Sequence, residues 1–342
     1  MSSKLKLIQC GVGGFGKGWV ENHTSKSPDF EVVALVDISP EALAEAGRIC
    51  GVGPDRQFAS LQEAIDRVPA DAVLTVTPPA VHVQHARLAF AKGLHVMTEK
   101  PLAATVADAL EMLALAEKSG RQLQVSQQYR YNSFIRKLRQ LLEAGTIGEF
   151  GHGHLDFYIP ADFTGTFREK MEFPLLLDMA IHHVDLIRAV TGRNITAVSA
   201  HSFRPSWSWY QHDPGLKMFL ELEGGLPFSY SGDWSGAGRT TGWSGDWRLQ
   251  GATGSLHLEK DKVFVAKCGR WSKNESWEKA EIEPVEREPQ SETLWRFAEA
   301  IRSGRPAETS GADNIRSMAV VLAAIQSVKE ARTVTIEEVL RG

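Results

Sequence analysis

The sequence predicts an α/β protein in which a doubly wound parallel sheet is followed by an α+β domain with one large, open, mostly antiparallel sheet. Two observations lead to this prediction. The chain has 342 residues, more than twice the ~150 residues of an average domain. Strand-like and helix-like segments alternate in residues 1–125, whereas strand-like runs dominate from residue 150 onwards. We therefore expect one domain at residues 1–125 and a second at residues 126–342.

The alternation in the first domain predicts parallel strands joined by crossover helices. Short apolar runs predict strands at residues 5–10, 31–36, 72–77, 94–97 and 122–126. Apolar residues recur at helical spacing between them, which predicts helices at residues 15–25, 40–49, 61–68, 81–91 and 106–118.

The second domain begins with an amphipathic helix predicted at residues 133–143. Antiparallel strands are predicted at residues 150–159, 195–203, 217–222, 226–231, 246–249 and 255–266. Further helices are predicted at residues 175–190, 291–303 and 313–331.

The composition restricts the classes of partner. Lys and Arg number 38 and Asp and Glu 42, which gives a net charge of −4. Without net positive charge there is no general attraction to nucleic acid or to an anionic membrane, so we expect neither partner. No apolar run reaches the ~20 residues of a membrane-spanning helix, and the N-terminus lacks a signal-peptide pattern. Three widely spaced cysteines are typical of thiols in a reducing compartment, so we expect a cytoplasmic protein.

A glycine-rich motif follows the first predicted strand and opens the first helix. The segment Gly-Val-Gly-Gly-Phe-Gly at 11–16 matches G-x-G-x-x-G. The first glycine permits a tight turn, the second lets the backbone approach a pyrophosphate, and the last lets the helix pack on the sheet. Amides at the start of that helix favour an anion. The candidates for dinucleotide binding are therefore Gly11, Gly13, Gly14, Phe15 and Gly16. A purely structural glycine turn is the alternative.

Asp37 ends the second predicted strand, where a carboxylate can accept hydrogen bonds from an adenosine ribose. A 2′-phosphate ~4 Å away would meet a repulsion of up to about 4 kcal/mol at an effective dielectric constant of ~20. The neighbours Ile38 and Ser39 supply no arginine for a phosphate, although one could come from elsewhere. We therefore expect NAD rather than NADP.

Two further motifs follow the third and fourth of the predicted strands. Ligands of open parallel sheets bind at the carboxyl ends of strands, so we expect these motifs to face the cofactor. The candidates are Thr77, Pro78, His82, Glu99 and Lys100. The alternatives are an exposed loop lysine for Lys100 and a helix-start residue without chemical function for His82.

The helix predicted at residues 175–190 carries a candidate acid–base pair. Asp178 and His182 are four positions apart and share a face, so the carboxylate can orient the imidazole. A histidine placed in this way can act as a general base. The alternatives are a structural Asp–His pair and a metal site that includes His183. Adjacent helical residues point ~100° apart, so we expect no metal.

In their order and spacing, these motifs resemble the Gfo/Idh/MocA family, named after glucose–fructose oxidoreductase, inositol dehydrogenase and a rhizopine-catabolism protein. The resemblance extends over nearly the whole chain, to the Gly-Ala-Thr-Gly-Ser-Leu segment at 251–256. It implies an N-terminal Rossmann domain, a C-terminal α/β domain with a mainly antiparallel sheet, and NAD(P)-dependent oxidation of a secondary alcohol of a sugar, sugar derivative or cyclitol. By this resemblance Lys100, Asp178 and His182 match the family's catalytic lysine, aspartate and histidine.

The chain departs from the family pattern beside the expected substrate pocket. The family often has a glycine run before the helix aspartate, where this sequence has Phe-Pro-Leu-Leu-Leu at 173–177. Ala180 replaces a glycine, and His183 stands where an aliphatic residue is usual. These departures concern the choice of substrate rather than the chemistry. From their positions, the expected substrate-binding residues are Arg130, Asn132, Tyr158, Arg168 and His183, with Tyr129 and Tyr131 in the same segments.

The resemblance also implies how the residues act together. Lys100 would hydrogen-bond the reacting oxygen, His182 would exchange the proton, and Asp178 would fix His182 or bind a neighbouring hydroxyl. Tryptophans between residues 207 and 247 could stack on sugars, but tryptophans on an open sheet more often bury a subunit interface. We therefore expect a homodimer or homotetramer formed through the C-terminal sheet. A glycoside hydrolase that retains NAD and a non-catalytic sensor of dinucleotide and metabolite are the alternatives.

Overall fold

The computed structural model describes residues 3–268 and 275–341, and the chain divides into two compact units. The first unit comprises Met1–Gln128 and Arg287–Ile315, and the second comprises Tyr129–Glu286 and Arg316–Gly342. The sequence division differs in one respect, because it assigns all of residues 126–342 to the second domain. Residues 287–315 pack with the first unit because helix α8 (Pro289–Ser303) buries an apolar face in that unit's core.

The first unit is built on a parallel sheet of six strands in the order β3-β2-β1-β4-β5-β6. The five predicted strands are all present, and β3 is too short for a hydrophobic pattern to predict it. The order reverses between β1 and β4, which is the switch point where open α/β sheets bind ligands. The strands are β1 (Leu5–Cys10), β2 (Phe30–Val36), β3 (Gln57–Phe58), β4 (Ala72–Thr75), β5 (His95–Glu99) and β6 (Leu123–Ser126).

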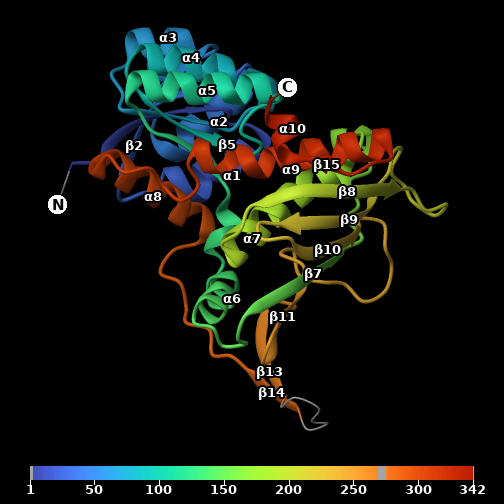
Figure 1. Ribbon diagram of the computed structural model, residues 1–342. Helices are drawn as coiled ribbons and strands as arrows, with labels where there is room; N and C mark the ends of the chain where they lie inside the picture. Colours follow the sequence, from blue (N-terminus) through green and yellow to red (C-terminus); the bar gives the residue numbers. More distant parts are fainter. Residues whose placement is uncertain (1–2, 269–274, 342) are drawn as a thin grey trace. The chain divides into compact units, whose positions relative to one another are not determined.

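Helices cover both faces of this sheet, as the doubly wound prediction requires (Figure 1). Helix α4 packs against both α3 and α5, whereas α2 and α8 both pack on the π-helical turn η1 (Val20–Thr24) that continues α1. The helix predicted at residues 15–25 therefore consists of two parts, the α-helix α1 and the π-helical turn η1. The remaining helices of this unit are α1 (Gly14–Trp19), α2 (Pro40–Cys50), α3 (Leu61–Arg67), α4 (His82–Ala91) and α5 (Val106–Ser119).

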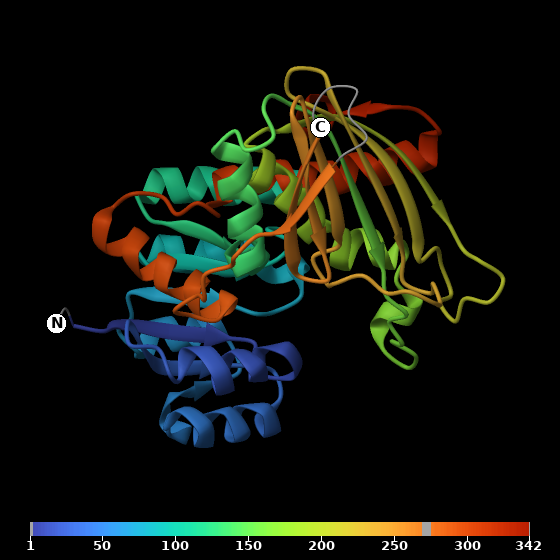
Figure 2. The ribbon, with the colours of Figure 1, turned by 90° about the horizontal axis from the view of Figure 1, so that it is seen from below.

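The second unit contains a nine-stranded sheet in the order β14-β13-β12-β11-β7-β10-β9-β8-β15, and Figure 2 shows its strands side by side. All neighbouring strands are antiparallel except β7 and β10, which are parallel. The strands are β7 (Phe150–Tyr158), β8 (Ile195–Phe203), β9 (Gly215–Leu222), β10 (Leu226–Asp233), β11 (Asp246–Gly251), β12 (Gly254–Glu259), β13 (Lys262–Cys268), β14 (Glu275–Lys279) and β15 (Val334–Thr335).

The single strand predicted at residues 255–266 is two strands, β12 and β13, joined by a tight turn. Lys260 and Asp261 form this turn with φ angles of 45° and 64°. Such turns usually carry Asn or Gly, so the lysine at the first position removes the ordinary sequence signal. The run therefore looks continuous in the sequence although it reverses direction.

One face of the nine-stranded sheet is covered by helices and the other is open. A single hydrophobic cluster joins the inward side chains of the strands to α6, α7, the second half of α9, and α10. Strand β9 shows the difference, because Leu220 is buried while Lys217 and Phe219 on the other face are exposed. These helices are α6 (Ser133–Glu143), α7 (Ile181–Thr191), α9 (Gly311–Glu330) and α10 (Ile336–Arg341).

Helix α7 is preceded by the π-helical turn η6 (Leu175–Ala180), so the predicted helix at 175–190 also changes type within its length. A wider turn is not visible in apolar periodicity. The turn ends at Ala180, two residues before His182, the candidate base on this helix. Among residues 3–268 and 275–341, no helix is both long and apolar enough to cross a membrane.

Candidate active site

The glycine turn after β1 leaves no room for a side chain at Gly11 or at Gly16. Gly11 has a φ of +80°, and a Cβ atom on it would lie 2.2 Å from the carbonyl oxygen of Val76. A Cβ atom on Gly16 would lie 2.1 Å from the carbonyl oxygen of Gly11. Gly13 precedes α1, and no side chain caps that helix. The turn therefore brings bare backbone to the switch point of the sheet, while the Phe15 side chain is exposed.

Asp37 lies directly beside this turn. Its Oδ2 accepts hydrogen bonds from the amides of Val12 and Gly13 at 2.8 and 3.2 Å, and its Oδ1 accepts one from the amide of Ser39 at 2.9 Å. The carboxylate is therefore fixed between the ends of β1 and β2. This is the place that the predicted contact to a ribose requires.

The end of β4 reaches the same turn through Thr77. The Thr77 methyl group would lie 3.1 Å from a Cβ atom on Gly11. The Thr77 hydroxyl is 2.9 Å from the Thr75 hydroxyl, which in turn is 2.9 Å from Nδ1 of His85. Burial lowers the pKa of His85 to about 4, so its imidazole is neutral at pH 7.

His82 joins the loops that follow β4 and β5. Its Nε2 donates to the carbonyl oxygen of Thr77 at 3.0 Å. Its Nδ1 lies 2.8 Å from the Thr98 hydroxyl and 3.2 Å from the carbonyl oxygens of Pro101 and Leu102. The side chain is fully buried, and burial lowers its pKa. His82 was expected to face the cofactor, but with no exposed surface it holds two loops together instead.

Glu99 is an internal residue as well. Its Oε1 accepts from Nε1 of Trp19 at 2.9 Å, and its Oε2 accepts from the amide of Lys100 at 3.1 Å. Burial raises the pKa of Glu99, although the neighbouring charge of Lys100 acts in the opposite direction. Lys100 itself is partly exposed at the carboxyl end of the sheet. The first unit thus places Lys100 and the glycine turn at one edge, with Glu99 as support from within.

In the second unit, the structure brings Asp178 and Arg168 together. Nε of Arg168 lies 2.5 Å from Oδ2 of Asp178, and its guanidinium stacks over the rings of Phe163 and Phe167 at 4.9 and 4.7 Å. His182, four residues further along, is only 4% exposed and stacks against the Tyr129 ring with 4.4 Å between ring centroids. Arg168 is therefore the expected substrate residue that lies beside the helix aspartate.

His183 has no surface to offer a ligand. It is fully buried, its Nδ1 is 3.0 Å from the Tyr230 hydroxyl, and its Nε2 donates to the carbonyl oxygen of Trp243 at 3.0 Å. Burial lowers its pKa to about 4. Its expected contact with substrate does not fit this geometry, because the ring packs against Phe157 and Tyr230 and both ring nitrogens have partners within the protein.

Tyr158 lies on the open face of the sheet. The preceding residue of β7, Phe157, packs against His183 from the covered face, and successive strand residues point to opposite faces. The Tyr158 hydroxyl is 2.5 Å from the Ser231 hydroxyl and 3.0 Å from Nζ of Lys217. Tyr158 was expected to bind substrate near His182. This expectation is wrong, because the pleat of β7 points Tyr158 to the face of the sheet opposite the one that packs against His183.

Arg130 and Asn132 also have partners within the second unit. Arg130 forms two hydrogen bonds of 2.6 Å to Asp185, and both side chains are buried. Nδ2 of Asn132 donates to the hydroxyl of Ser244 at 3.3 Å. Sequence reasoning named Arg130 for substrate and did not foresee its carboxylate partner or the stacking of Tyr129 on His182. The sequence features that could have indicated these contacts are the position of Asp185, three residues after His182, and the segment at 128–132 that carries Tyr129 and Arg130.

Comparisons with known proteins match both units. Residues 5–127 match a family described as oxidoreductases with an NAD-binding Rossmann fold, and residues 135–257 match the GFO/IDH/MocA C-terminal domain. D-Apiose dehydrogenase from Paraburkholderia graminis is 27% identical over 98% of this chain and 90% of its own length. Inositol 2-dehydrogenase 1 from Paenarthrobacter aurescens is 28% identical over 66% of each chain.

Solved structures share the fold along the whole chain. An oxidoreductase from Agrobacterium radiobacter in complex with NAD+, L-tartaric acid and magnesium superposes with a TM-score of 0.87, at 21% identity over 98% of this chain and 99% of that one. A levoglucosan dehydrogenase in complex with NADH superposes with a TM-score of 0.81, at 19% identity over 98% and 99% of the two chains. The predicted fold class, a Rossmann domain followed by a mostly antiparallel sheet domain, is thereby confirmed.

Proposed function

The chain belongs to the Gfo/Idh/MocA family of oxidoreductases, and from this premise we propose that it is an NAD-dependent dehydrogenase of a sugar, sugar derivative or cyclitol. The reaction moves a hydride between a secondary alcohol carbon and C4 of the nicotinamide. Relatives named for apiose and inositol support this substrate class. The observation that carries the proposal is the presence of the lysine after β5 together with Asp178 in η6 and His182 at the start of α7, in a chain with an NAD-binding fold.

The residues of the first unit fit a dinucleotide. The glycine turn has no space for a Cβ atom at Gly11 or Gly16, so it stays tight and packs closely on the sheet, and its backbone can approach a pyrophosphate. Asp37 is held beside it with a carboxylate suited to ribose hydroxyls. The same negative charge disfavours a 2′-phosphate, which supports NAD over NADP. When bound, the nicotinamide supplies the hydride acceptor.

The proposed roles of the protein residues follow from their charges. The ammonium of Lys100 donates a hydrogen bond to the reacting oxygen and stabilises alkoxide character. The His182 imidazole takes the proton of the same hydroxyl, a general-base contribution of ~10²–10⁴ in rate. Asp178, held by Arg168 at 2.5 Å, binds a neighbouring hydroxyl or orients His182. The protein residues would thus hold the reacting oxygen and take up its proton, and the bound nicotinamide would supply the hydride acceptor.

A substrate panel tests this proposal. Polyols, aldoses and inositols are offered with NAD and with NADP while the absorbance of reduced nicotinamide is followed. We expect turnover with a member of the panel and a preference for NAD. Release of sugar from a glycoside without free NADH would instead support a hydrolase that retains its cofactor, and binding of dinucleotide and metabolite without any turnover would support a sensor.

Two variants test the assigned residues. We expect Lys100→Met and His182→Ala each to lower kcat by about 10² or more. Their dissociation constants for NAD, measured by calorimetry, should change little because neither residue contributes to the glycine turn. Lys92→Met, a surface lysine of the same unit that pairs with Asp66, is the control. Normal turnover in either active-site variant removes that residue from the mechanism.

We further propose that the protein is cytoplasmic and that it forms a homodimer or homotetramer through the open face of the nine-stranded sheet. Among the tryptophans expected at an interface, Trp234 and Trp247 lie in the core instead, whereas Trp207 and Trp243 are exposed. Exposed Phe219 and Trp277 on the sheet support an interface there.

A further inference from the structure

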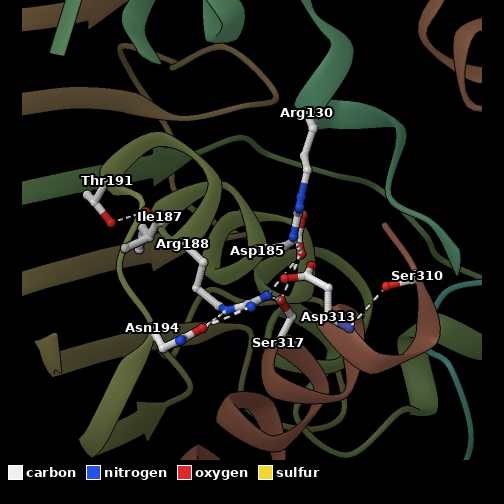
Figure 3. A network of polar contacts seen from close by, with 9 residues as sticks. All are labelled: Arg130, Asp185, Ile187, Arg188, Thr191, Asn194, Ser310, Asp313 and Ser317. Carbon is white, nitrogen blue, oxygen red and sulfur yellow. Dashed lines mark hydrogen bonds and ion pairs between the residues drawn. The ribbon is translucent and has the colours of Figure 1, made fainter. Parts of the chain in front are cut away.

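A buried polar network surrounds Asp185 in the second unit (Figure 3). Arg130 binds both carboxylate oxygens of Asp185, with Nε 2.6 Å from Oδ2 and Nη2 2.6 Å from Oδ1. The Ser317 hydroxyl donates to Oδ1 at 2.7 Å. Nη1 of Arg188 lies 3.7 Å from Oδ1 and 2.7 Å from the Ser317 hydroxyl, and the same guanidinium binds Oδ1 of Asn194.

Stability alone is a weak explanation for this network. Desolvating buried charges offsets most of their attraction, and apolar residues of similar shape often stabilise a protein as well or better. A paired guanidinium and carboxylate do fix the relative orientation of the two side chains, because two parallel hydrogen bonds hold one planar group against the other. The side chains of Arg130 and Asp185 are 5% and 1% exposed, so solvent does not loosen this geometry.

The orientation of Arg130 relative to Asp185 matters because each of them has a neighbour, Tyr129 or His182, in the proposed site. Tyr129 immediately precedes Arg130, and His182 precedes Asp185 by three positions on α7. Residues three apart on a helix lie on the same face. The Tyr129 and His182 rings are stacked, with 4.4 Å between centroids and 23° between planes. One segment therefore meets α7 at two adjacent points, an ion pair and a ring stack.

The ion pair is the stronger constraint of the two. A charge-assisted bidentate pair is about twice as strong as neutral hydrogen bonds and highly directional. A stack between two aromatic rings tolerates sliding and tilting. Arg130 belongs to the short helical turn η4 (Gln128–Tyr131), so fixing its backbone also fixes that of Tyr129. The position of the Tyr129 ring over the imidazole thus depends on the link to Asp185.

We propose that Arg130 and Asp185 are a positioning pair that holds the Tyr129 ring against the His182 imidazole, and that this stack keeps the imidazole in its working orientation. The proposal rests on the proposed role of His182 as general base. The pair does not touch the reacting atoms. It acts through Tyr129, which covers one face of the imidazole and leaves its ring edge to exchange the proton.

Kinetics of four variants test the link. Arg130→Lys keeps the charge but loses the planar fork, and Tyr129→Leu removes the ring. Each should lower kcat about 10-fold or more while the dissociation constant for NAD stays within about two-fold. Tyr129→Phe keeps the ring and should keep kcat. Asn194→Ala removes the two hydrogen bonds that Arg188 donates to Oδ1 of Asn194, touches neither Arg130 nor Tyr129, and is the matched control.

A double variant separates positioning from general loosening. If Arg130 acts only through Tyr129, then Arg130→Lys combined with Tyr129→Leu should be no slower than Tyr129→Leu alone. Independent losses that multiply would overturn the proposal. So would normal kcat in folded Arg130→Lys. Asp185→Asn, which keeps the shape of the side chain, is the second variant if Arg130→Lys fails to fold, and Tyr129→Leu decides if both fail.

A spectroscopic measurement works without turnover. In protein with isotope-labelled histidine rings, the His182 signal is assigned by its loss in His182→Ala. The Tyr129 ring current shifts that signal, and we expect the shift to vanish in Tyr129→Leu and in Arg130→Lys and to persist in Tyr129→Phe and Asn194→Ala. An unchanged shift in Arg130→Lys contradicts the proposal. Normal turnover in His182→Ala would instead refute the general base and leave the stack itself measurable.

Discussion

Two adjacent histidines on α7 differ completely in their surroundings. His183 is enclosed by Phe157, Tyr230 and the Trp243 backbone, and its Nε2 must carry the proton because it faces a carbonyl oxygen. His182 points away by about 100° and stacks against Tyr129. The same residue type is therefore a fixed, neutral core group at one position and a candidate base at the next.

The buried state of His183 predicts a loss of stability in acid. Its pKa is lowered by burial to about 4 in the folded protein, against ~6.5 in an unfolded chain. The unfolded state therefore binds the proton first, so the stabilisation is complete above pH ~6.5 and is lost as the pH falls toward ~4. For this one residue we expect a loss of about 2 kcal/mol between pH 7 and pH 5.

Urea unfolding of the native chain and of His183→Gln at pH 7 and pH 5 measures this term. Glutamine can still pair with the Tyr230 hydroxyl but does not titrate, so the difference in unfolding free energy between the two pH values should shrink. His152→Gln is the control for replacing a histidine by glutamine, because His152 is exposed on β7. An equal pH dependence in His183→Gln would show that the imidazole is not the group that titrates.

At the scale of elements, α4 positions two loops that carry candidate functional residues. The His82 ring contacts the carbonyl oxygen of Thr77 after β4 and those of Pro101 and Leu102 after β5. Thr77 approaches the glycine turn, and Lys100 directly precedes Pro101. One buried side chain thus sets the distance between two parts of the proposed site.

We expect His82→Gln to lower kcat/KM about 10-fold or more, since a glutamine has too few contacts to hold both loops. Steady-state kinetics and thermal unfolding measure the effect and its cost in stability. His95→Gln is matched to it, because His95 is also a buried histidine whose pKa is lowered by burial but lies at the amino end of β5. If both variants lose the same activity for the same loss of stability, His82 has no positioning role.

Elements with local signals could be predicted from the sequence. Helix α2 begins where Ser39 caps the amide of Ala42 and ends at Gly51 with a φ of 76°, as the Ser-Pro start and the glycine indicate. The hairpin between β12 and β13 could not be predicted, because its turn carries Lys260 and Asp261. The π-helical turns and the two-residue β3 likewise lack a periodic signal.

The residues of the candidate site likewise divide into those that a local sequence motif predicts and those that only the fold brings together. The glycine turn, Asp37, Lys100, Asp178 and His182 could be named because each lies within a short motif. The pairing of Arg130 with Asp185 joins residues that are 55 positions apart, and only folding brings them together. A local pattern shows which residue types are present, but whether an arginine meets a substrate or a buried carboxylate depends on the tertiary contacts.

At the scale of the whole molecule, the open face of the nine-stranded sheet is the surface most suited to another copy of the chain. Strand register places His154, Phe219, Phe264 and Trp277 on this face. Phe219 is 58% exposed and Trp277 is 47% exposed. Large exposed apolar side chains on a sheet mark surfaces of association, and a two-fold axis lets one such face pair with itself.

We therefore expect light scattering to give at least twice the mass of one chain, and Phe219→Asp to shift the protein toward monomers. A carboxylate at this position would be desolvated without a partner in the interface, whereas in the monomer it stays in water. Thermal unfolding at low protein concentration should change little, since Phe219 contributes nothing to the core. Leu110→Asp is the control, because Leu110 is 44% exposed on α5 of the first unit. A monomeric native chain, or an unchanged assembly in Phe219→Asp, would exclude this part of the sheet as the interface.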